Sequence, residues 1–294
     1  MRLVYLGSPE AAVPPLQALV AAGHEVVLVV SMPDRRRGRG GATSPTPVKA
    51  VALELGLPVT DQLDAVLGVD ADLGVVVAYG RILGPDLLAH LPMVNLHFSL
   101  LPRWRGAAPV ERGLLEGDAT TGVCVMAVEQ GLDTGGVHAR AELPIGPADT
   151  AAGLRAQLSE VGATLLVDAL AKGLGDPEPQ GEDGITYAKK IMVDDLCIDW
   201  SAPAVLADRQ VRVGGAWTTF RGQRLKVLAA ELLDGLPDDL RDVAPGTVGS
   251  NATVRCGDGA LRLVEVGPEG KRPMAAGDWA NGARPAGEQL GTEN

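Results

Sequence analysis

The sequence contains few cysteines, histidines and aromatic residues. Of its 294 residues, three are cysteine and four are histidine, and aromatic residues make up 3%. The cysteines at positions 124, 197 and 256 lie far apart and match no metal-ligand spacing, and no His-Glu-x-x-His motif occurs. We therefore expect no metal site. A sparse, odd set of cysteines is typical of free thiols in a reducing cytoplasm.

Long hydrophobic runs are also missing. No apolar stretch approaches the roughly 18 residues that a membrane-spanning helix needs. The first residues do not fit a signal peptide, because Pro9, Glu10, Pro14 and Pro15 interrupt any apolar stretch. We expect a cytoplasmic protein with no membrane partner, and the length allows two domains.

Positive charge is scarce overall, since the formal net charge is −11. Such a balance disfavours a nucleic-acid partner. The distribution qualifies this conclusion: 201–294 has 11 basic and 12 acidic residues, which leaves 15 basic and 25 acidic residues in 1–200. Within that acidic part, arginine occupies positions 35, 36, 37 and 39. A charge run of this kind is often only solvated surface, but it could also contact phosphates.

Alternating strand and helix patterns predict an α/β fold for the first two thirds of the chain. Residues 25–30 form a nearly continuous β-branched run, which is typical of a strand buried on both faces of a parallel sheet. We predict strands over 2–6, 25–30, 73–80, 94–100, 121–128 and 137–143, a mobile loop over 32–45, and helices after an N-cap at Ser8 and over 47–57, 83–90, 109–116 and 150–170. This order predicts a Rossmann-like, doubly wound, mostly parallel sheet. A dinucleotide-binding dehydrogenase is disfavoured, because no Gly-x-Gly-x-x-Gly follows the first strand.

The last third of the sequence predicts a second, smaller domain. Residues 173–184 are rich in glycine, proline and acidic residues, which indicates the end of the first domain. We expect domains over 1–184 and 201–294, with a linker over 185–200. A helix capped by Ser201 should run to about residue 213, followed by short strands over 217–220, 224–230, 247–249, 253–256 and 261–266. Five short strands and a helix favour a small, OB-like β-barrel.

One stretch carries recognisable chemistry. Asn95 and His97 are two residues apart among apolar neighbours, so in a strand their side chains share a face. An amide can donate to a developing oxyanion and an imidazole can carry a proton, which suits acyl transfer. The spacing alone leaves a structural role open, with the Asn closing a turn and the His satisfied in a half-buried position.

A wider pattern around this stretch resembles a known family. Its residues are Asn95-x-His97-x-Ser99-Leu100-Leu101-Pro102-x-x-Arg105-Gly106, Gly131-Leu132-Asp133-Thr134-Gly135 and Thr186-Tyr187-Ala188-Lys189-Lys190. The pattern is similar to that of the enzymes that use 10-formyltetrahydrofolate as formyl donor. The resemblance implies that Asn95, His97 and Asp133 are catalytic, and that Ser99, Leu100, Leu101 and Pro102 contact the folate. Spacing alone would not pair Asp133 with His97 and would favour a turn-capping role for it.

The arginine-rich segment resembles an insertion of one branch of this family. Residues 32–49 are similar to the tRNA-facing segment of members that formylate initiator methionyl-tRNA. The resemblance implies that Arg35, Arg36, Arg37 and Arg39 contact tRNA, and that the partners are initiator methionyl-tRNA and folate. We expect a monomer. The alternatives are a formyltransferase for the amine of a sugar nucleotide or glycinamide ribotide, and a tRNA-binding or folate-binding protein without catalysis. The near-neutral second domain and the arginines favour the tRNA substrate.

Overall fold

The computed structural model describes residues 1–36 and 43–291, with two compact units. The N-terminal unit comprises Met1–Val110, Ala119–Ile145 and Gly153–Lys190. The C-terminal unit comprises Glu111–Asp118, Gly146–Ala152 and Ile191–Asn294. The division into 1–184, 185–200 and 201–294 stays a prediction.

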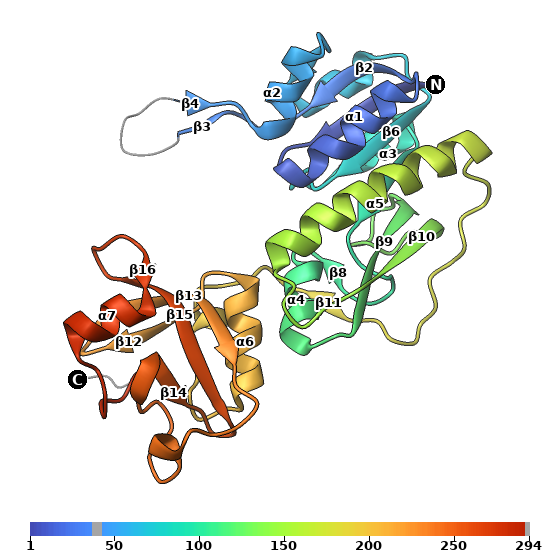
Figure 1. The fold of residues 1–294 in the computed structure, drawn as a ribbon. Coiled ribbons are helices and arrows are strands. Elements are labelled where there is room, and N and C mark those ends of the chain that lie inside the picture. The colour runs from blue at the N-terminus through green and yellow to red at the C-terminus, as the bar shows by residue number, and fades with distance from the viewer. Residues whose placement is uncertain (37–42, 292–294) are drawn as a thin grey trace. The chain divides into compact units, whose positions relative to one another are not determined.

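A seven-stranded sheet forms the centre of the N-terminal unit (Figure 1). Its strands are β1 (Arg2–Gly7), β2 (Glu25–Val30), β5 (Val59–Thr60), β6 (Leu73–Val77), β7 (Met93–His97), β9 (Thr120–Ala127) and β10 (Val137–Pro144). They are ordered β10-β9-β7-β6-β1-β2-β5, with β7 to β5 parallel and the β7–β9 and β9–β10 pairs antiparallel. The mostly parallel, Rossmann-like sheet predicted from the sequence is confirmed. Because β1 lies between β2 and β6, the strand order reverses there, and such sheets bind ligands at the carboxyl ends of their strands.

Helix α5 packs against only one of the two faces of β7. The helices of this part of the chain are α1 (Val13–Ala21), α2 (Pro47–Glu54), α3 (Pro85–His90), α4 (Pro109–Glu116) and α5 (Ala151–Lys172), with short 3₁₀ turns at Glu10–Ala12 and Leu63–Gly68. A Cβ at Gly162 of α5 would lie 2.8 Å from the Leu96 side chain and 3.1 Å from that of Val123. The missing side chain thus lets α5 approach the Leu96 face closely. The opposite face of β7 carries Met93, Asn95 and His97.

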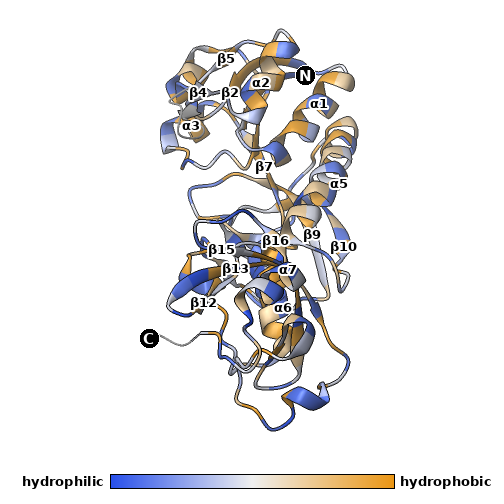
Figure 2. Cartoon of the chain, turned by 60° about the vertical axis from the view of Figure 1, so that its left-hand side comes forward, coloured by the Kyte–Doolittle hydropathy of each residue, from blue (hydrophilic) through white to orange (hydrophobic). Residues whose placement is uncertain are grey.

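The interior of this unit is apolar. In Figure 2, β2 and β7 are coloured toward the hydrophobic end of the scale. One buried cluster combines Val4 and Leu6 of β1 with Val30 of β2, Met93 of β7 and Tyr79, which follows β6. The burial of β2 on both faces explains its unbroken apolar sequence.

Several local predictions for this unit are wrong. Ser8 does not cap a helix: its Oγ accepts a hydrogen bond from Met32 N at 3.0 Å, and α1 begins five residues later. The strand predicted over 94–100 is β7, which ends at His97. In the segment expected to be an unstructured loop, β3 (Arg35–Arg36) pairs with β4 (Thr43–Ser44). These two-residue strands have no periodicity that a sequence could reveal.

The C-terminal unit contains a five-stranded antiparallel sheet. Its strands are β12 (Trp217–Phe220), β13 (Gln223–Leu232), β14 (Thr253–Arg255), β15 (Ala260–Pro268) and β16 (Met274–Ala275). They are ordered β12-β13-β15-β14, with β16 paired to β15. The predicted strands over 217–220 and 224–230 form the β12–β13 hairpin, and those over 253–256 and 261–266 form the β14–β15 hairpin. Leu225, Val227, Val254 and Trp200 belong to the buried core of this unit.

The C-terminal unit also contains helices α6 (Ala204–Val213) and α7 (Ala276–Ala283), and Glu111–Asp118 adds most of α4 to it. Ser201 does not cap α6, because its Oγ donates to Asp199 Oδ1 at 2.6 Å and Pro203 stands at the N-cap. The strand predicted over 247–249 is also wrong, since Thr247 and Val248 form only isolated bridges. Helix α7 was not predicted, because its short sequence contains two glycines.

Membrane spans and metal clusters are not features of the described residues. None of their helices combines the length and the hydropathy of a membrane span. Within 1–36 and 43–291, no three His, Cys, Asp or Glu side chains gather in a way that could hold a metal ion.

Candidate active site

Strand β7 presents an amide and an imidazole near its carboxyl end. Asn95 is half-buried, and its side-chain amide makes no hydrogen bond to any residue within 1–36 and 43–291. His97, two residues on, is only 5% exposed. The amide is therefore available to an external hydrogen-bond partner, whereas the imidazole is held inside the unit.

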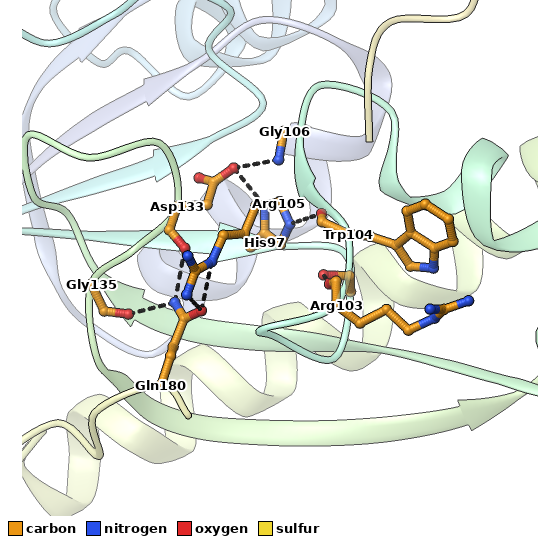
Figure 3. Close-up of polar contacts among 9 residues, drawn as sticks. His97, Arg103, Trp104, Arg105, Gly106, Asp133, Gly135 and Gln180 are labelled. Atoms are coloured by element: carbon orange, nitrogen blue, oxygen red, sulfur yellow. Dashed lines mark hydrogen bonds and ion pairs between the residues drawn. The ribbon is translucent and has the colours of Figure 1, made fainter. Parts of the chain in front are cut away.

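Both ring nitrogens of His97 face oxygen atoms (Figure 3). Nε2 lies 2.9 Å from the backbone oxygen of Trp104. Because a carbonyl oxygen can only accept, Nε2 is the proton-bearing atom in this hydrogen bond. Nδ1 lies 3.7 Å from Asp133 Oδ2, an ion-pair distance that is longer than a hydrogen bond. The same carboxylate oxygen accepts a hydrogen bond of 2.8 Å from Gly106 N.

The loop that carries Asp133 is held by Gln180. Its Nε2 donates to the backbone oxygens of Asp133 at 2.8 Å and of Gly135 at 2.7 Å. Its Oε1 accepts from Arg105 Nε at 3.0 Å and Nη2 at 2.7 Å. Figure 3 shows this amide between the buried guanidinium and the loop. Sequence reasoning missed Gln180, which is 47 residues from Asp133.

Thr186 fixes the residue that contacts the imidazole. Its Oγ1 accepts from Trp104 N at 2.8 Å, and its backbone oxygen accepts from Arg105 N at 2.9 Å. Next to these bonds, β8 (Arg105–Gly106) pairs in parallel with β11 (Tyr187–Ala188). No sequence pattern predicts this two-residue pairing, and β11 lies within the stretch expected to be a linker.

Within the N-terminal unit, strained backbone conformations occur in the segments around this site. Among the described non-glycine residues of the N-terminal unit, Ala78, Trp104 and Asp133 have positive φ, at 45°, 65° and 51°. Ala78 follows β6, Trp104 follows β7, and Asp133 lies between β9 and β10. Non-glycine residues rarely adopt this conformation, which persists only where the surroundings enforce it and is common at functional sites.

The predicted folate segment is partly buried. Ser99 is 1% exposed and its Oγ donates to Arg103 O at 2.7 Å, and Leu101 is also buried. Leu100 and Pro102 are half-buried. In this segment the side chains of Leu100 and Pro102 and the backbone are therefore the parts most accessible to a ligand.

Tyr79 provides a second polar group without a partner. Its Oη is buried and has no hydrogen bond to any described residue, although the ring packs in the same cluster as Met93 of β7. Burial raises the pKa of Tyr79, and the nearby Arg81 partly opposes this shift. A buried hydroxyl without a partner is costly, so a polar ligand group would stabilise it.

Cys124 lies beside His97 but is not equipped as a nucleophile. It is the β9 residue opposite His97, and it is fully buried. Burial raises the pKa of the Cys124 thiol, which keeps it protonated at neutral pH. The polar groups available for chemistry are therefore the amide, the imidazole and the carboxylate.

The arginine-rich segment is only partly described. The backbone of Arg35 and Arg36 forms β3, whereas Arg37 and Arg39 lie outside the described residues. Lys49, at the start of α2, pairs with Asp34 at 2.7 Å.

Comparison with known proteins places this site in a family. The family model described as formyl transferase matches residues 1–170, and the model of the formyl transferase C-terminal domain matches residues 190–284. This chain belongs to the formyl transferase family. It is 46% identical to the methionyl-tRNA formyltransferase of Jannaschia sp. (strain CCS1), with 97% of each chain covered. It is 42% identical to the protein of that name from Methylococcus capsulatus, covering 99% of this chain and all of the relative.

Solved structures with a similar fold are more distant in sequence. The N-formyltransferase from Helicobacter canadensis, solved with folinic acid and dTDP-3-aminofucose, has a TM-score of 0.67 at 15% identity, covering 89% of this chain and 98% of that one. HypX from Aquifex aeolicus, solved with tetrahydrofolic acid, has a TM-score of 0.66 at 16% identity, and the match covers 95% of this chain and 47% of that one. These likenesses show that the fold is shared.

Proposed function

We propose that this formyl transferase moves the formyl group of 10-formyltetrahydrofolate to the amino group of methionyl-initiator tRNA, for translation initiation. The assignment of formyl transfer as the reaction rests on the free amide of Asn95 beside the His97–Asp133 pair. The choice of substrate rests on similarity to methionyl-tRNA formyltransferases over nearly the full length of the chain. The protein acts as a cytoplasmic monomer.

Formyl transfer requires stabilisation of charge on one oxygen and the movement of one proton. The amine nitrogen forms a bond to the formyl carbon, the bond from that carbon to the folate nitrogen breaks, and a proton leaves the amine for the folate nitrogen. Asn95 donates a hydrogen bond to the formyl oxygen as negative charge develops there. One such donor contributes about 10²–10³ in rate.

His97 carries the proton in this account. With Nε2 donating to Trp104, Nδ1 is the ring atom able to accept the proton that the amine releases. Asp133, 3.7 Å from Nδ1, stabilises the resulting imidazolium, and the Gly106 N–H keeps the carboxylate in place. The proton then passes to the departing folate nitrogen. No serine or cysteine nucleophile takes part.

The folate lies at the carboxyl ends of β6 and β7 in this proposal. Ser99, Leu100, Leu101 and Pro102 form one wall, in which the half-buried Leu100 and Pro102 offer the accessible side chains. The unpartnered Tyr79 hydroxyl and Asn95 amide supply the polar contacts that a mostly apolar ligand site requires. The tRNA is bound by Arg35, Arg36, Arg37 and Arg39.

A substrate panel tests the proposed function. Purified protein is incubated with formyl-labelled 10-formyltetrahydrofolate and with methionyl-initiator tRNA, free methionine or a dTDP-amino sugar. We expect label to appear on the aminoacyl-tRNA and to remain at background with the other two acceptors. Label on the sugar nucleotide but not on the tRNA would contradict the proposed substrate, and no transfer to any acceptor would contradict the proposed activity.

A further inference from the structure

The segment 180–188 contacts the backbone around both His97 and Asp133. We propose that Gln180 and Thr186 are positioning residues for formyl transfer: Gln180 fixes the loop that carries Asp133, and Thr186 fixes the Trp104 carbonyl that holds His97. The inference rests on the proposed function, because it assigns these residues to the same reaction.

Gln180 uses its whole amide to hold the Asp133 loop. Two donor contacts reach the backbone oxygens of Asp133 and Gly135, and two acceptor contacts come from Arg105. Asp133 has a φ of 51°, so the loop needs such contacts to keep its carboxylate directed at His97. The buried Arg105 in turn fixes the orientation of the amide, because its two N–H groups require the oxygen to face them.

Thr186 acts on the other side of the imidazole. Trp104 has a φ of 65°, and both of its backbone polar groups form hydrogen bonds. Its N–H donates to Thr186 Oγ1, and its carbonyl oxygen accepts from His97 Nε2. The next N–H, that of Arg105, donates to the backbone oxygen of Thr186. A single threonine thus fixes the strained residue whose carbonyl sets the ring orientation and the position of its proton.

These hydrogen bonds, rather than ordinary packing, hold Asp133 and His97 in position. Asp133 and His97 come from different elements, and 36 residues separate them in the sequence. The β8–β11 pairing and the bonds from Ala107 N and Ala108 N to the Ala188 oxygen extend the same attachment. Removal of one of these hydrogen bonds should therefore alter the Nδ1–Oδ2 geometry while the sheet stays intact. A misplacement of about 1 Å can cost about 100-fold in rate.

Four substitutions isolate the hydrogen bonds. Gln180→Met removes both ends of the amide, whereas Gln180→Glu keeps an oxygen for Arg105 and removes the N–H donors to the loop. Thr186→Val removes the hydroxyl at nearly constant shape, and Thr186→Ser restores it. Thr164→Val is the matched control, because the Thr164 hydroxyl is exposed on α5 and contacts only the helix backbone.

We expect kcat to fall about 10- to 100-fold in Gln180→Met, Gln180→Glu and Thr186→Val, with KM for 10-formyltetrahydrofolate within about twofold of the parent. Thr186→Ser and Thr164→Val should retain the parent kcat. Hydrogen exchange, which needs no substrate, should accelerate in peptides covering 129–136 for the Gln180 variants and 103–106 for Thr186→Val.

The two readouts separate this inference from the proposed function. If the parent protein fails to formylate methionyl-tRNA, the proposed function falls, while exchange still reports whether Gln180 and Thr186 hold the two segments. Parent-like exchange in these segments in folded Gln180→Glu and Thr186→Val would overturn the positioning roles. So would an active parent whose kcat these substitutions leave unchanged, or a Thr186→Ser variant as slow as Thr186→Val.

Discussion

At the residue scale, the site consists of a few side chains fixed by backbone groups. The Asn95 and His97 pair could be picked out from the sequence because a strand places alternate residues on one face. The partnership of Asp133 with His97 was predicted only through the family resemblance. Gln180 could not be found by either route, because its hydrogen bonds join segments distant in the sequence and depend on the loop conformation.

Gly106 provides a residue-scale prediction. Its φ is 122°, and a Cβ there would lie 2.8 Å from the Ala188 oxygen, while its N–H donates to Asp133. We expect Gly106→Ala to lower the free energy of unfolding by about 1–3 kcal/mol. Turnover should fall at least about tenfold, because β8 must move and withdraw its donor from the carboxylate. Urea denaturation and initial rates measure both effects.

Gly181→Ala is the control for this substitution. No atom lies within 4 Å of a Cβ added at Gly181, and its φ is not in the left-handed region. Its stability should change by less than about 1 kcal/mol. Equal stability and turnover of the Gly106 and Gly181 variants would show that the close approach at Ala188 is unimportant.

Among the helices and strands, segments with a recognisable apolar pattern were predictable and the two-residue strands were not. The limits of α4 and β2 agree with the predicted ranges, because eight-residue amphipathic and six-residue buried patterns are distinctive. The two-residue strands β3, β8 and β11 depend on partners elsewhere in the chain. Ser8 does not act as the predicted cap because its hydroxyl accepts from Met32 N of a distant segment. The Ser201 hydroxyl forms a local hydrogen bond to Asp199 instead.

The arginine-rich segment gives a prediction at this scale. Replacement of Arg35, Arg36, Arg37 and Arg39 by serine should raise KM for tRNA and leave KM for 10-formyltetrahydrofolate unchanged. The slope of log affinity for tRNA against log salt concentration should become shallower by about 0.7 to 0.9 for each phosphate that the protein no longer binds, and so by up to about 3.6 for four arginines. Titration of KM between low and moderate salt measures this slope.

Lys172→Ser serves as the control, because Lys172 is an exposed cation in the last turn of α5. An unchanged salt slope in the four-serine protein would show that this segment does not belong to the tRNA-binding surface. The same change in slope for Lys172→Ser would show that overall charge, rather than the segment, governs binding.

At the scale of the whole molecule, each unit has its own sheet and its own core. The fold class was predictable because strand and helix patterns alternate in the first part and short strands dominate the last. The excess acidity falls in 1–200, together with the proposed catalytic residues, whereas 201–294 is nearly neutral. An acidic chain that binds tRNA must therefore rely on local basic groups.

In the proposed function, Asn95, His97 and Asp133 together drive formyl transfer. The most direct measurement is the single-turnover rate of formyl transfer to methionyl-initiator tRNA by Asn95→Ala, His97→Ala and Asp133→Ala, with the exposed His90→Ala as control. We expect the rate of each of the three variants to fall at least about 100-fold with an unchanged circular dichroism spectrum, while the control keeps the parent rate. A folded His97→Ala protein with a near-parent rate would contradict this expectation.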